Sequence, residues 1–563
     1  MLHDLYTTRG EGLAGTPWTV YPRPQMKRDS YLNLNGEWEF SVKEPEFTGK
    51  TIQVPFCPES LLSGIHEHFE EGMPLWYRRG FVLPEDFNRG RVLLHIGAAD
   101  QCLQCWVNGI HVGSHSGGYE AVAFDITKAL REENEIRILC VDDLHNQSYP
   151  YGKQVRPEKR GGMWYTPVSG IWQTVWLESV PETYIEKLMV ENRRYSVTIS
   201  TAPVLEGKVT VAGLGEFELQ NGSVTVTPEN PRLWSPEDPY LYDFTVEAGE
   251  DRVESYFAIR SLEVKTAGKY PRLCLNGKPY FFHGLLDQGY WPDGLFTPAA
   301  PECYADDILA MKALGFNTLR KHIKVEPEEF YYQCDKLGMI VWQDMVNNSD
   351  YHFLRDTVLP TAGIQRMDDR NLHKDGNSRR EFLREARAAV EQLGSHPCIC
   401  YWTIFNEGWG QFDSDNVYDL FRTWDDTRFI DTNSGWFRRE KSDVDSRHVY
   451  FRKVKLHGDG VKPLVLSEFG GKTYKAEGHL FNPDKSYGYG GCDSLEALNE
   501  AVAKLYLEEV LPCVRNGLCA AIYTQVSDVE DEINGLLTYD RKVCKLTAET
   551  MLPVAEELQK ACK

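Results

Sequence analysis

The sequence has too few basic residues to suit a nucleic acid or an anionic membrane surface, and too few long apolar runs to enter a bilayer. Its 61 Lys and Arg are outnumbered by 83 Asp and Glu, for a formal net charge of −22, whereas a phosphate-rich partner needs a basic face. No apolar run reaches the roughly 18 residues of a membrane span, and the start "MLHDLYTTRGEGLAG" lacks the pattern of a signal peptide. We therefore expect no nucleic-acid partner, no membrane association and a cytoplasmic location.

Metal and disulfide motifs are also scarce. The 14 cysteines are scattered, and without an export signal we predict reduced, mostly buried thiols. Only Cys102 and Cys105 have CxxC spacing, in a strand-like run with no second pair nearby, so a zinc or redox role is the weaker alternative. We expect no required cofactor.

At 563 residues the chain is too long for one hydrophobic core, and about two to four domains are expected. Residues 1–182 contain short runs that alternate apolar and polar side chains, which predicts an all-β sandwich. Within them Asn108 and Gly109 suit a tight hairpin turn. Residues 183–265 continue the pattern at the length of an immunoglobulin-like β-sandwich.

Residues 266–563 follow a different pattern, in which helical segments ending in glycine precede compact apolar strands. Gly315, Gly338, Gly394 and Gly517 are predicted to close helices in the left-handed conformation, and Ser378 with Glu381 has the spacing of a capping box. Eight candidate strands occur in this part, and strands buried on both faces indicate a parallel sheet. The sequence predicts a (β/α)8 TIM barrel.

Active sites of such barrels lie at the carboxyl ends of the strands. Polar residues at the predicted strand ends are therefore the candidates for function. They are Asp287, Arg320, His322, Asp344, Asn406, Glu407, Tyr450, Glu468 and Gln525.

Two of these candidates are glutamates that follow apolar strands, Glu407 in "YWTIFNEGWG" and Glu468 in "PLVLSEFGG". Each alone could be the salt-bridge partner of a nearby cation. Together they suit cleavage of a glycosidic bond, where one carboxyl group protonates the departing oxygen and the other attacks the anomeric carbon or activates water. Burial among aromatic residues would keep one of them protonated near neutrality by raising its pKa.

The whole chain resembles glycoside hydrolase family 2, which contains β-galactosidases, β-glucuronidases and β-mannosidases. The resemblance rests on "LNLNGEWEFSV", "VNGIHVGSHSGGYEAVAFDIT" and "SGIWQTVWLESV" for a jelly-roll domain, on "FAIRSLEV" and "LNGKPYFFHG" for entry into the barrel, and on "FNE" with "SEFGG". It implies a jelly-roll β-sandwich, an immunoglobulin-like β-sandwich and a catalytic TIM barrel.

The resemblance also implies a retaining mechanism. Glu407 on the fourth barrel strand would be the general acid/base and Glu468 on the seventh the nucleophile, with the carboxyl groups about 5–5.5 Å apart. Asn406 would bind the sugar 2-hydroxyl, Arg320 would contact the nucleophile, and Tyr450 would donate a hydrogen bond to it.

Other expected substrate contacts are grouped by place. His322 matches a histidine near the sugar but equally suits a core role. Trp342, Trp402, Trp409, Asp287 and Asp344 are interpreted as a sugar platform. A loop of the first domain supplies the site's edge through Arg156, Lys159, Arg160 and Trp164, or is merely a solvated charged loop.

The identity of the sugar is less determined. The eighth strand has "YTQVSD" where many relatives have a tryptophan, and the Asn-x-Lys element of β-glucuronidases is absent after the nucleophile. We favour an exo-acting β-galactosidase. A β-uronidase is the alternative, with cations predicted near the barrel mouth at Arg320, Lys321, Lys324, Lys472 and Lys475.

A different class of function is a catalytically silent carbohydrate-binding protein, because β-sandwich domains often only bind sugars. The two intact glutamates disfavour it. The expected partner in either case is a small glycoside or oligosaccharide. Homo-oligomers are common among similar enzymes, but the sequence does not fix an oligomeric state.

Overall fold

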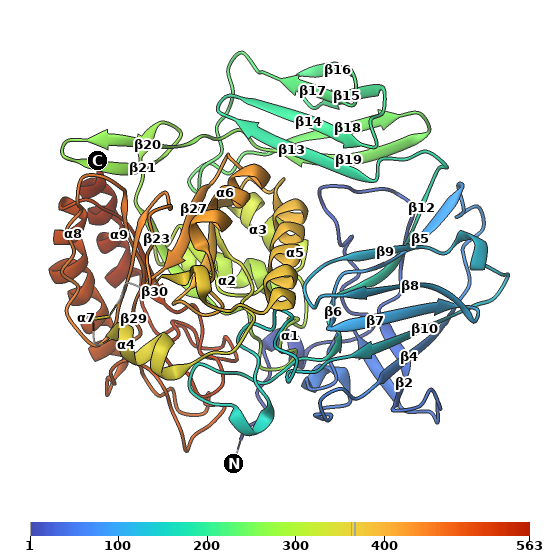
Figure 1. Cartoon of the computed structure of the whole chain (residues 1–563), viewed down its shortest axis with the longest axis horizontal. Helices are drawn as coiled ribbons and strands as arrows, with labels where there is room; N and C mark the ends of the chain where they lie inside the picture. Colours follow the sequence, from blue (N-terminus) through green and yellow to red (C-terminus); the bar gives the residue numbers. More distant parts are fainter. Residues whose placement is uncertain (1, 362, 365–367) are drawn as a thin grey trace.

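A computed structural model describes residues 2–361, 363–364 and 368–563 of the chain. It has three parts, coloured in chain order in Figure 1: a blue β-sandwich beside the barrel, a green β-sandwich that spans both, and a barrel in yellow to red. None of the helices in the described ranges is long and apolar enough to cross a membrane. The predicted fold class, two sandwiches and a TM barrel, is confirmed.

The first sandwich packs a four-stranded sheet, in the order β1-β12-β5-β9, against a six-stranded one, β3-β2-β4-β10-β7-β8. A short antiparallel pair, β6 (Ala99–Asp100) and β11 (Gly170–Ile171), forms a separate two-stranded sheet. As predicted, Asn108 and Gly109 form the turn between β7 and β8, both with positive φ. The longer strands are β1 (Tyr31–Asn33), β2 (Gly36–Val42), β3 (Thr51–Val54), β4 (Leu75–Phe81), β5 (Arg91–Ile96), β7 (Cys102–Val107), β8 (Ile110–Ser116), β9 (Val122–Asp125), β10 (Asn134–Val141) and β12 (Val175–Val180).

The second sandwich has one sheet in the order β13-β14-β17 and another in the order β16-β15-β18-β19. Apolar side chains alternate inward along these strands and form a separate core,. The strands are β13 (Lys187–Arg193), β14 (Ser196–Ala202), β15 (Gly207–Val211), β16 (Gly215–Leu219), β17 (Ser223–Val226), β18 (Tyr242–Ala248) and β19 (Asp251–Phe257). The connector β20 (Leu262–Ala267), β21 (Tyr270–Leu275) and β22 (Lys278–Pro279) leads into the barrel.

The barrel contains eight parallel strands in the order β27-β26-β25-β24-β23-β30-β29-β28. Each overlaps one of the eight candidate strands predicted from the sequence. The two ends of this order approach each other through the hydroxyl groups of Ser434 and Ser446, 3.4 Å apart. The strands are β23 (Phe282–Asp287), β24 (Thr318–Lys321), β25 (Ile340–Asp344), β26 (Ile399–Asn406), β27 (Phe429–Ser434), β28 (Asp445–Val449), β29 (Leu464–Gly470) and β30 (Leu518–Thr524).

The helices between these strands correct two predicted details. The helix α5 begins at Gly376, where the carboxylate of Asp375 accepts from the Ser378 amide, so Ser378 is not the N-cap. At its other end Gly394 has φ −60°, not a left-handed φ. The helices of the barrel are α2 (Glu302–Ala313), α3 (Glu328–Leu337), the pair η4 (Leu354–Val358) and α4 (Leu359–Thr361), α5 (Gly376–Leu393), α6 (Ser414–Trp424), α7 (Leu495–Leu505) with η6 (Tyr506–Val510), α8 (Leu511–Arg515) and α9 (Ala548–Cys562).

The first sandwich closes one side of the barrel mouth. Its loop 145–169 docks on the segment after β30, where Arg160 forms an ion pair with Glu530 at 3.0 Å and the Thr166 amide donates to the same carboxylate. The Tyr151 hydroxyl donates to the Ser349 carbonyl after β25. Residues far apart in the sequence therefore share the rim of the barrel.

The structure predicts how the thiols react. All 14 cysteines are free; Cys544 is exposed, Cys102 and Cys492 are half-buried, and the rest are buried. We expect a thiol reagent to modify one to three thiols of the native protein and all 14 after denaturation. Mass spectrometry of the native adduct identifies the reactive sites, and a native protein that titrates most of its thiols would contradict this packing.

Candidate active site

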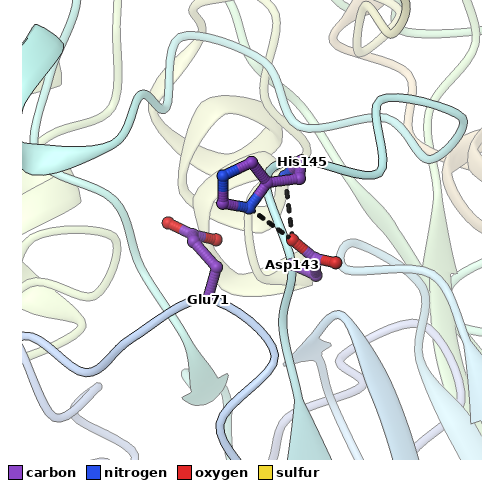
Figure 2. Close-up of side chains that lie close together, drawn as sticks. All are labelled: Glu71, Asp143 and His145. Carbon is purple, nitrogen blue, oxygen red and sulfur yellow. Dashed lines mark hydrogen bonds and ion pairs between the residues drawn. The ribbon is translucent and has the colours of Figure 1, made fainter.

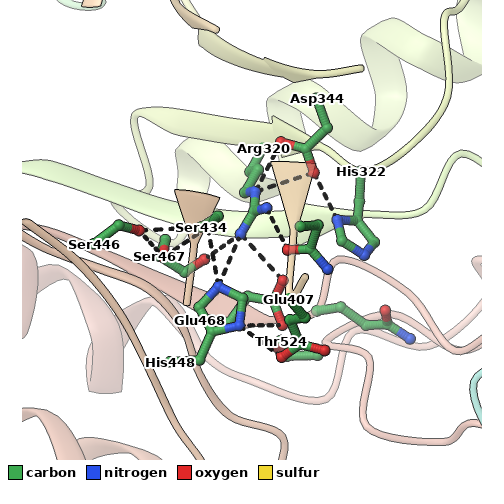
Figure 3. Close-up of polar contacts among 12 residues, drawn as sticks. Arg320, His322, Asp344, Glu407, Ser434, Ser446, His448, Ser467, Glu468 and Thr524 are labelled. Atoms are coloured by element: carbon green, nitrogen blue, oxygen red, sulfur yellow. Dashed lines mark hydrogen bonds and ion pairs between the residues drawn. The ribbon is translucent and has the colours of Figure 1, made fainter. Parts of the chain in front are cut away.

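Two carboxylates face each other at the carboxyl end of the barrel. Glu407 directly follows β26 and Glu468 lies in β29, and both line one cavity of about 320 Å³. An oxygen of each lies within 4.8 Å of the other and of a ring nitrogen of His448 (Figure 3). The two predicted catalytic residues are brought together at a spacing that lets them act on one atom.

A buried guanidinium organises the base of this cavity. Arg320 of β24 is fully buried and contacts Asp344 at 2.9 Å, Glu468 at 3.1 Å and the side-chain oxygen of Asn406 at 2.8 Å. Burial opposes the charge of Arg320, but Asp344 and Glu468 outweigh it and raise the Arg320 pKa. Nδ1 of His322 in turn lies 2.7 Å from Oδ2 of Asp344 (Figure 3).

Glu468 accepts hydrogen bonds from two directions. Arg320 donates to its Oε1, and the hydroxyl of Tyr450 donates to its Oε2 at 2.8 Å. Tyr450 also lies 2.7 Å from the hydroxyl of Thr524 at the end of β30. Both partners of Glu468 are donors, so it is held as an acceptor with its oxygens at fixed positions.

Glu407 has a different environment. Burial raises its pKa, against the smaller opposing effects of Lys153, His322 and Arg320. Its side chain keeps 18% of its surface exposed, toward the cavity. Its nearest polar partner is the imidazole of His448, whose Nδ1 lies 2.7 Å from Oε1 of Glu407. Glu407 therefore holds a proton to higher pH than an ordinary glutamate.

Residues of the barrel and of the first sandwich together line the cavity. Lys153 and Met163 come from the sandwich loop, and Glu532 from the segment after β30. Glu532 is buried and accepts from the Tyr165 hydroxyl at 2.5 Å and from the Asn534 amide at 3.0 Å. The remaining lining residues are Leu286, Gln288, His322, Phe353, Thr357, Pro360, Asn406, Trp436, His448, Tyr450, Phe451, Arg452, Tyr487, Tyr489 and Thr524.

The expected tryptophan platform is not formed by the residues named for it. Trp342 is buried and stacks on Tyr401 inside the barrel, with ring centroids 3.9 Å apart. Trp402 is equally buried and donates to Asp425. Trp409 donates to the Ser349 carbonyl beneath the rim. None of the three lines the cavity. The side chains of Trp342 and Trp402 point from their strands into the packed interior, and the loop after β26 directs Trp409 into it as well.

Several polar candidates also act behind the cavity. Asp287 pairs with Lys321 at 2.6 Å, and Asp344 supports Arg320. Gln525 accepts from Gln288, and only the latter reaches the cavity wall. Fewer cationic side chains face the barrel mouth than the sequence predicted. Lys321 and the buried Lys324 both form ion pairs with Glu326.

The loop predicted to form the edge of the site does line the cavity, but not through the four residues that the sequence suggested. Arg156 contacts His145, Arg160 pairs with Glu530, and Lys159 is exposed. The Trp164 ring packs on Trp409 with centroids 5.2 Å apart. Neither these residues nor Lys472 and Lys475 line the cavity. The loop backbone instead turns Lys153 and Met163 inward.

Three functional candidates were missed in the sequence: His448, Lys153 and Glu532. His448 lies two residues before Tyr450, so strand alternation placed it on the same face and was a usable signal. Lys153 and Glu532 lie in irregular segments. Their positions depend on docking between parts of the chain and left no periodic signal.

Two groups of side chains in the described ranges have ligand atoms close enough to hold a metal ion. One is the carboxylate pair with His448. The other, on the first sandwich, is Glu71, Asp143 and His145 (Figure 2). There His145 is hydrogen-bonded to Asp143 at 3.0 Å, and the guanidinium of Arg156 lies 2.9 Å from its other nitrogen. A cation beside that guanidinium is disfavoured, and this group is explained by its own contacts.

The fold and the site define a class: TIM-barrel proteins with paired carboxylates at the strand ends. The chain matches the TIM barrel domain model of glycosyl hydrolases family 2 over residues 269–544. It matches that family's central model over 185–260 and its sugar binding domain over 65–181. The chain belongs to glycosyl hydrolases family 2.

Relatives in this family carry two kinds of name. A β-galactosidase of Thermoanaerobacter pseudethanolicus is 25% identical over 67% of this chain and 52% of its own length. A β-glucuronidase of Paenibacillus borealis is 26% identical over 69% of each chain. The chain thus spans about half the length of the former relative.

Solved structures share the fold over nearly the whole chain. A β-D-glucuronidase of Dictyoglomus thermophilum has a TM-score of 0.73 at 20% identity and covers 96% of this chain and 98% of its own. A β-galacturonidase of Eisenbergiella tayi bound to galacturonate has a TM-score of 0.67 at 18% identity and covers 96% and 99%. At these identities the likeness establishes the fold alone.

The arginine network predicts a large effect on stability. Replacing Arg320 with Met leaves the carboxylates of Asp344 and Glu468 buried without their cation, and we expect a loss of about 3–5 kcal/mol in the free energy of unfolding. Denaturant titration followed by tryptophan fluorescence measures it. The control is Arg194→Met, since Arg194 is 77% exposed with one distant ion pair. Equal stability of the two variants would contradict the assigned role.

Proposed function

We propose that this protein is a retaining exo-β-glycosidase. The observation that carries the proposal is the placement of Glu407 and Glu468 on one cavity with oxygens within 4.8 Å of each other. An inverting enzyme needs a wider gap, about 6.5–9.5 Å, to admit a water molecule between its carboxyl groups. The close pair instead supports direct attack on the sugar.

In the first step, Glu468 attacks the anomeric carbon and forms a glycosyl ester. The bond from that carbon to the aglycone oxygen breaks, and the proton of Glu407 passes to the departing oxygen. The environments support these roles, because Glu468 is held by two donors whereas burial raises the pKa of Glu407,.

In the second step, a water molecule takes the place of the aglycone. Glu407, now a carboxylate, removes a proton from the water as its oxygen bonds to the anomeric carbon, and the ester to Glu468 breaks. Two inversions at one carbon give net retention. Asn406, oriented by Arg320 at 2.8 Å, is placed to bind a hydroxyl of the sugar.

The shape of the cavity supports exo action. About 320 Å³ is near the lower limit of small-ligand sites,. The first sandwich contributes Lys153 and Met163 to its wall, which closes what would otherwise be an open barrel mouth. Such a pocket suits one terminal sugar residue.

The best-supported sugar is a neutral β-hexoside, with β-galactosides first. Glu532 adds a third carboxylate to the wall, and its oxygens can accept from sugar hydroxyls as well as from Tyr165 and Asn534. A sugar carboxylate beside Glu532 would meet like charge.

A β-uronide is the second candidate, and Lys153 favours it. Its ammonium belongs to the cavity wall and lies 5.4 Å from the centroid of the Trp164 ring. Burial raises the pKa of both Glu407 and Glu532, and the nearby charge of Lys153 opposes that rise. The relative from Paenibacillus borealis that is named β-glucuronidase also favours this candidate.

The catalytic pair is tested with nitrophenyl β-galactoside, β-glucuronide, β-galacturonide, β-glucoside and β-mannoside. We expect turnover of at least one substrate, with a loss of about 10⁴-fold or more in Glu468→Gln because the nucleophile is gone. The matched control is Glu477→Gln, an exposed glutamate outside the cavity. Sugar binding without turnover across the whole panel would favour the silent carbohydrate-binding alternative.

The sugar is tested by removing the two charges on the cavity wall. If neutral hexosides are the substrates, Glu532→Gln lowers kcat/KM for the β-galactoside by about 10-fold or more through a lost charged acceptor, and Lys153→Met has a smaller effect. If uronides are the substrates, Lys153→Met causes the larger loss on them. Lys128→Met, on the exposed surface of the first sandwich, is the control.

A further inference from the structure

We propose that His448 is a positioning residue for the acid/base: its ring donates a hydrogen bond to one oxygen of Glu407 and leaves the other oxygen to carry the catalytic proton. The inference rests on the proposed function and adds a residue to it. It is carried by the geometry around the imidazole in Figure 3.

The imidazole sits between the two carboxylates. Nδ1 of His448 lies 2.7 Å from Oε1 of Glu407 and 3.6 Å from Oε2 of Glu468. The first distance is that of a hydrogen bond and the second is too long for one. The side chain is fully buried, so solvent cannot replace this partner of Glu407.

The opposite nitrogen determines where the ring proton is. Nε2 of His448 lies 3.0 Å from the hydroxyl of Ser434 and 3.4 Å from Nη1 of Arg320. Nη1 of Arg320 also donates to the Ser467 carbonyl at 3.0 Å and to Oε1 of Glu468 at 3.1 Å. A hydrogen on Nε2 would face this cation, whereas a hydrogen on Nδ1 faces the carboxylate of Glu407, so the ring proton belongs on Nδ1. The Ser434 hydroxyl donates to that of Ser467 at 3.0 Å, and the Ser467 and Ser446 hydroxyls lie 2.6 Å apart.

The ring remains neutral over the range in which such enzymes work. Burial lowers the pKa of His448 to about 4. The charged groups that face it are Glu407 from the end of β26, Glu468 from β29, Arg320 from β24, Asp344 from β25 and Lys153 from the sandwich loop. A neutral donor can stay bonded to Glu407 in both of its protonation states.

This bond has a defined consequence in each step. When Glu407 is the acid, Oε1 is occupied by His448, and the proton lies on Oε2, the oxygen free to reach the aglycone. When Glu407 is the base, the same bond stabilises its carboxylate. Burial and the hydrogen bond therefore act on the Glu407 pKa in opposite directions.

Side chains from β28 and the residue after it contact both carboxylates. His448 in β28 contacts Glu407, and Tyr450, which directly follows the strand, contacts Glu468. Alternate residues of a strand point to the same face, so the spacing of these two side chains also spaces the carboxylates.

The test compares His448→Leu, which removes the donor, with His448→Gln, which retains an N–H group. For the Leu variant we expect kcat to fall by about 10- to 100-fold, with a larger loss for alkyl than for nitrophenyl glycosides. Loss of the donor raises the pKa of Glu407, so the alkaline limb of kcat/KM moves to higher pH. Gln should recover part of both effects, and His457→Asn, an exposed histidine bonded to Tyr270, should show neither.

A readout independent of activity is nitrogen NMR of the histidine-labelled protein. We expect a set of signals from a neutral ring protonated at Nδ1 that is lost in His448→Gln and shifted in Glu407→Gln. The signals of His322 and His396, whose Nδ1 atoms also face carboxylates, should remain in both variants. An Nε2–H tautomer, or an unchanged alkaline limb in both His448 variants, overturns the proposal. If the Leu variant does not fold, the Gln variant and the spectrum decide. Absence of turnover by the wild type, with the expected tautomer present, counts against the proposed function and not against the contact.

Discussion

The buried guanidinium of Arg320 is the interaction on which the site depends. It starts from β24 and reaches Asp344 on β25, Asn406 on β26 and Glu468 on β29. A planar group with several fixed donors can set these acceptors at defined angles, which a point charge could not. Because removing such a cation leaves uncompensated charge in the interior, these three contacts are coupled: the strand ends and the site geometry are held by the same bonds.

The two carboxylates of the cavity differ because of this network. Glu468 receives Arg320 and Tyr450 as donors, whereas Glu407 has burial and the ring of His448. Burial raises the pKa of Glu407. Two chemically identical side chains of one cavity thereby have different surroundings.

The first sandwich matters to the site through two inward-facing side chains. Its loop contacts the segment after β30 through the Arg160 ion pair with Glu530, and Lys153 of this loop and Glu532 of that segment both line the cavity. The charge that a sugar meets is therefore decided where two parts of the chain dock. The barrel alone provides the carboxylate pair and not the complete pocket.

The sequence by itself determined the eight barrel strands and the placement of Glu407 and Glu468 at their ends, because strand alternation, apolar runs and glycine signals are local. It did not determine which way a side chain in an all-buried strand points, so Trp342 and Trp402 were expected at the sugar and lie in packed interior. Nor did it determine the right-handed φ of Gly394 at the end of α5, or the presence of Lys153 and Glu532 in the cavity. The last feature depends on contacts between residues hundreds of positions apart, such as Tyr165 with Glu532, and only the tertiary structure decides it.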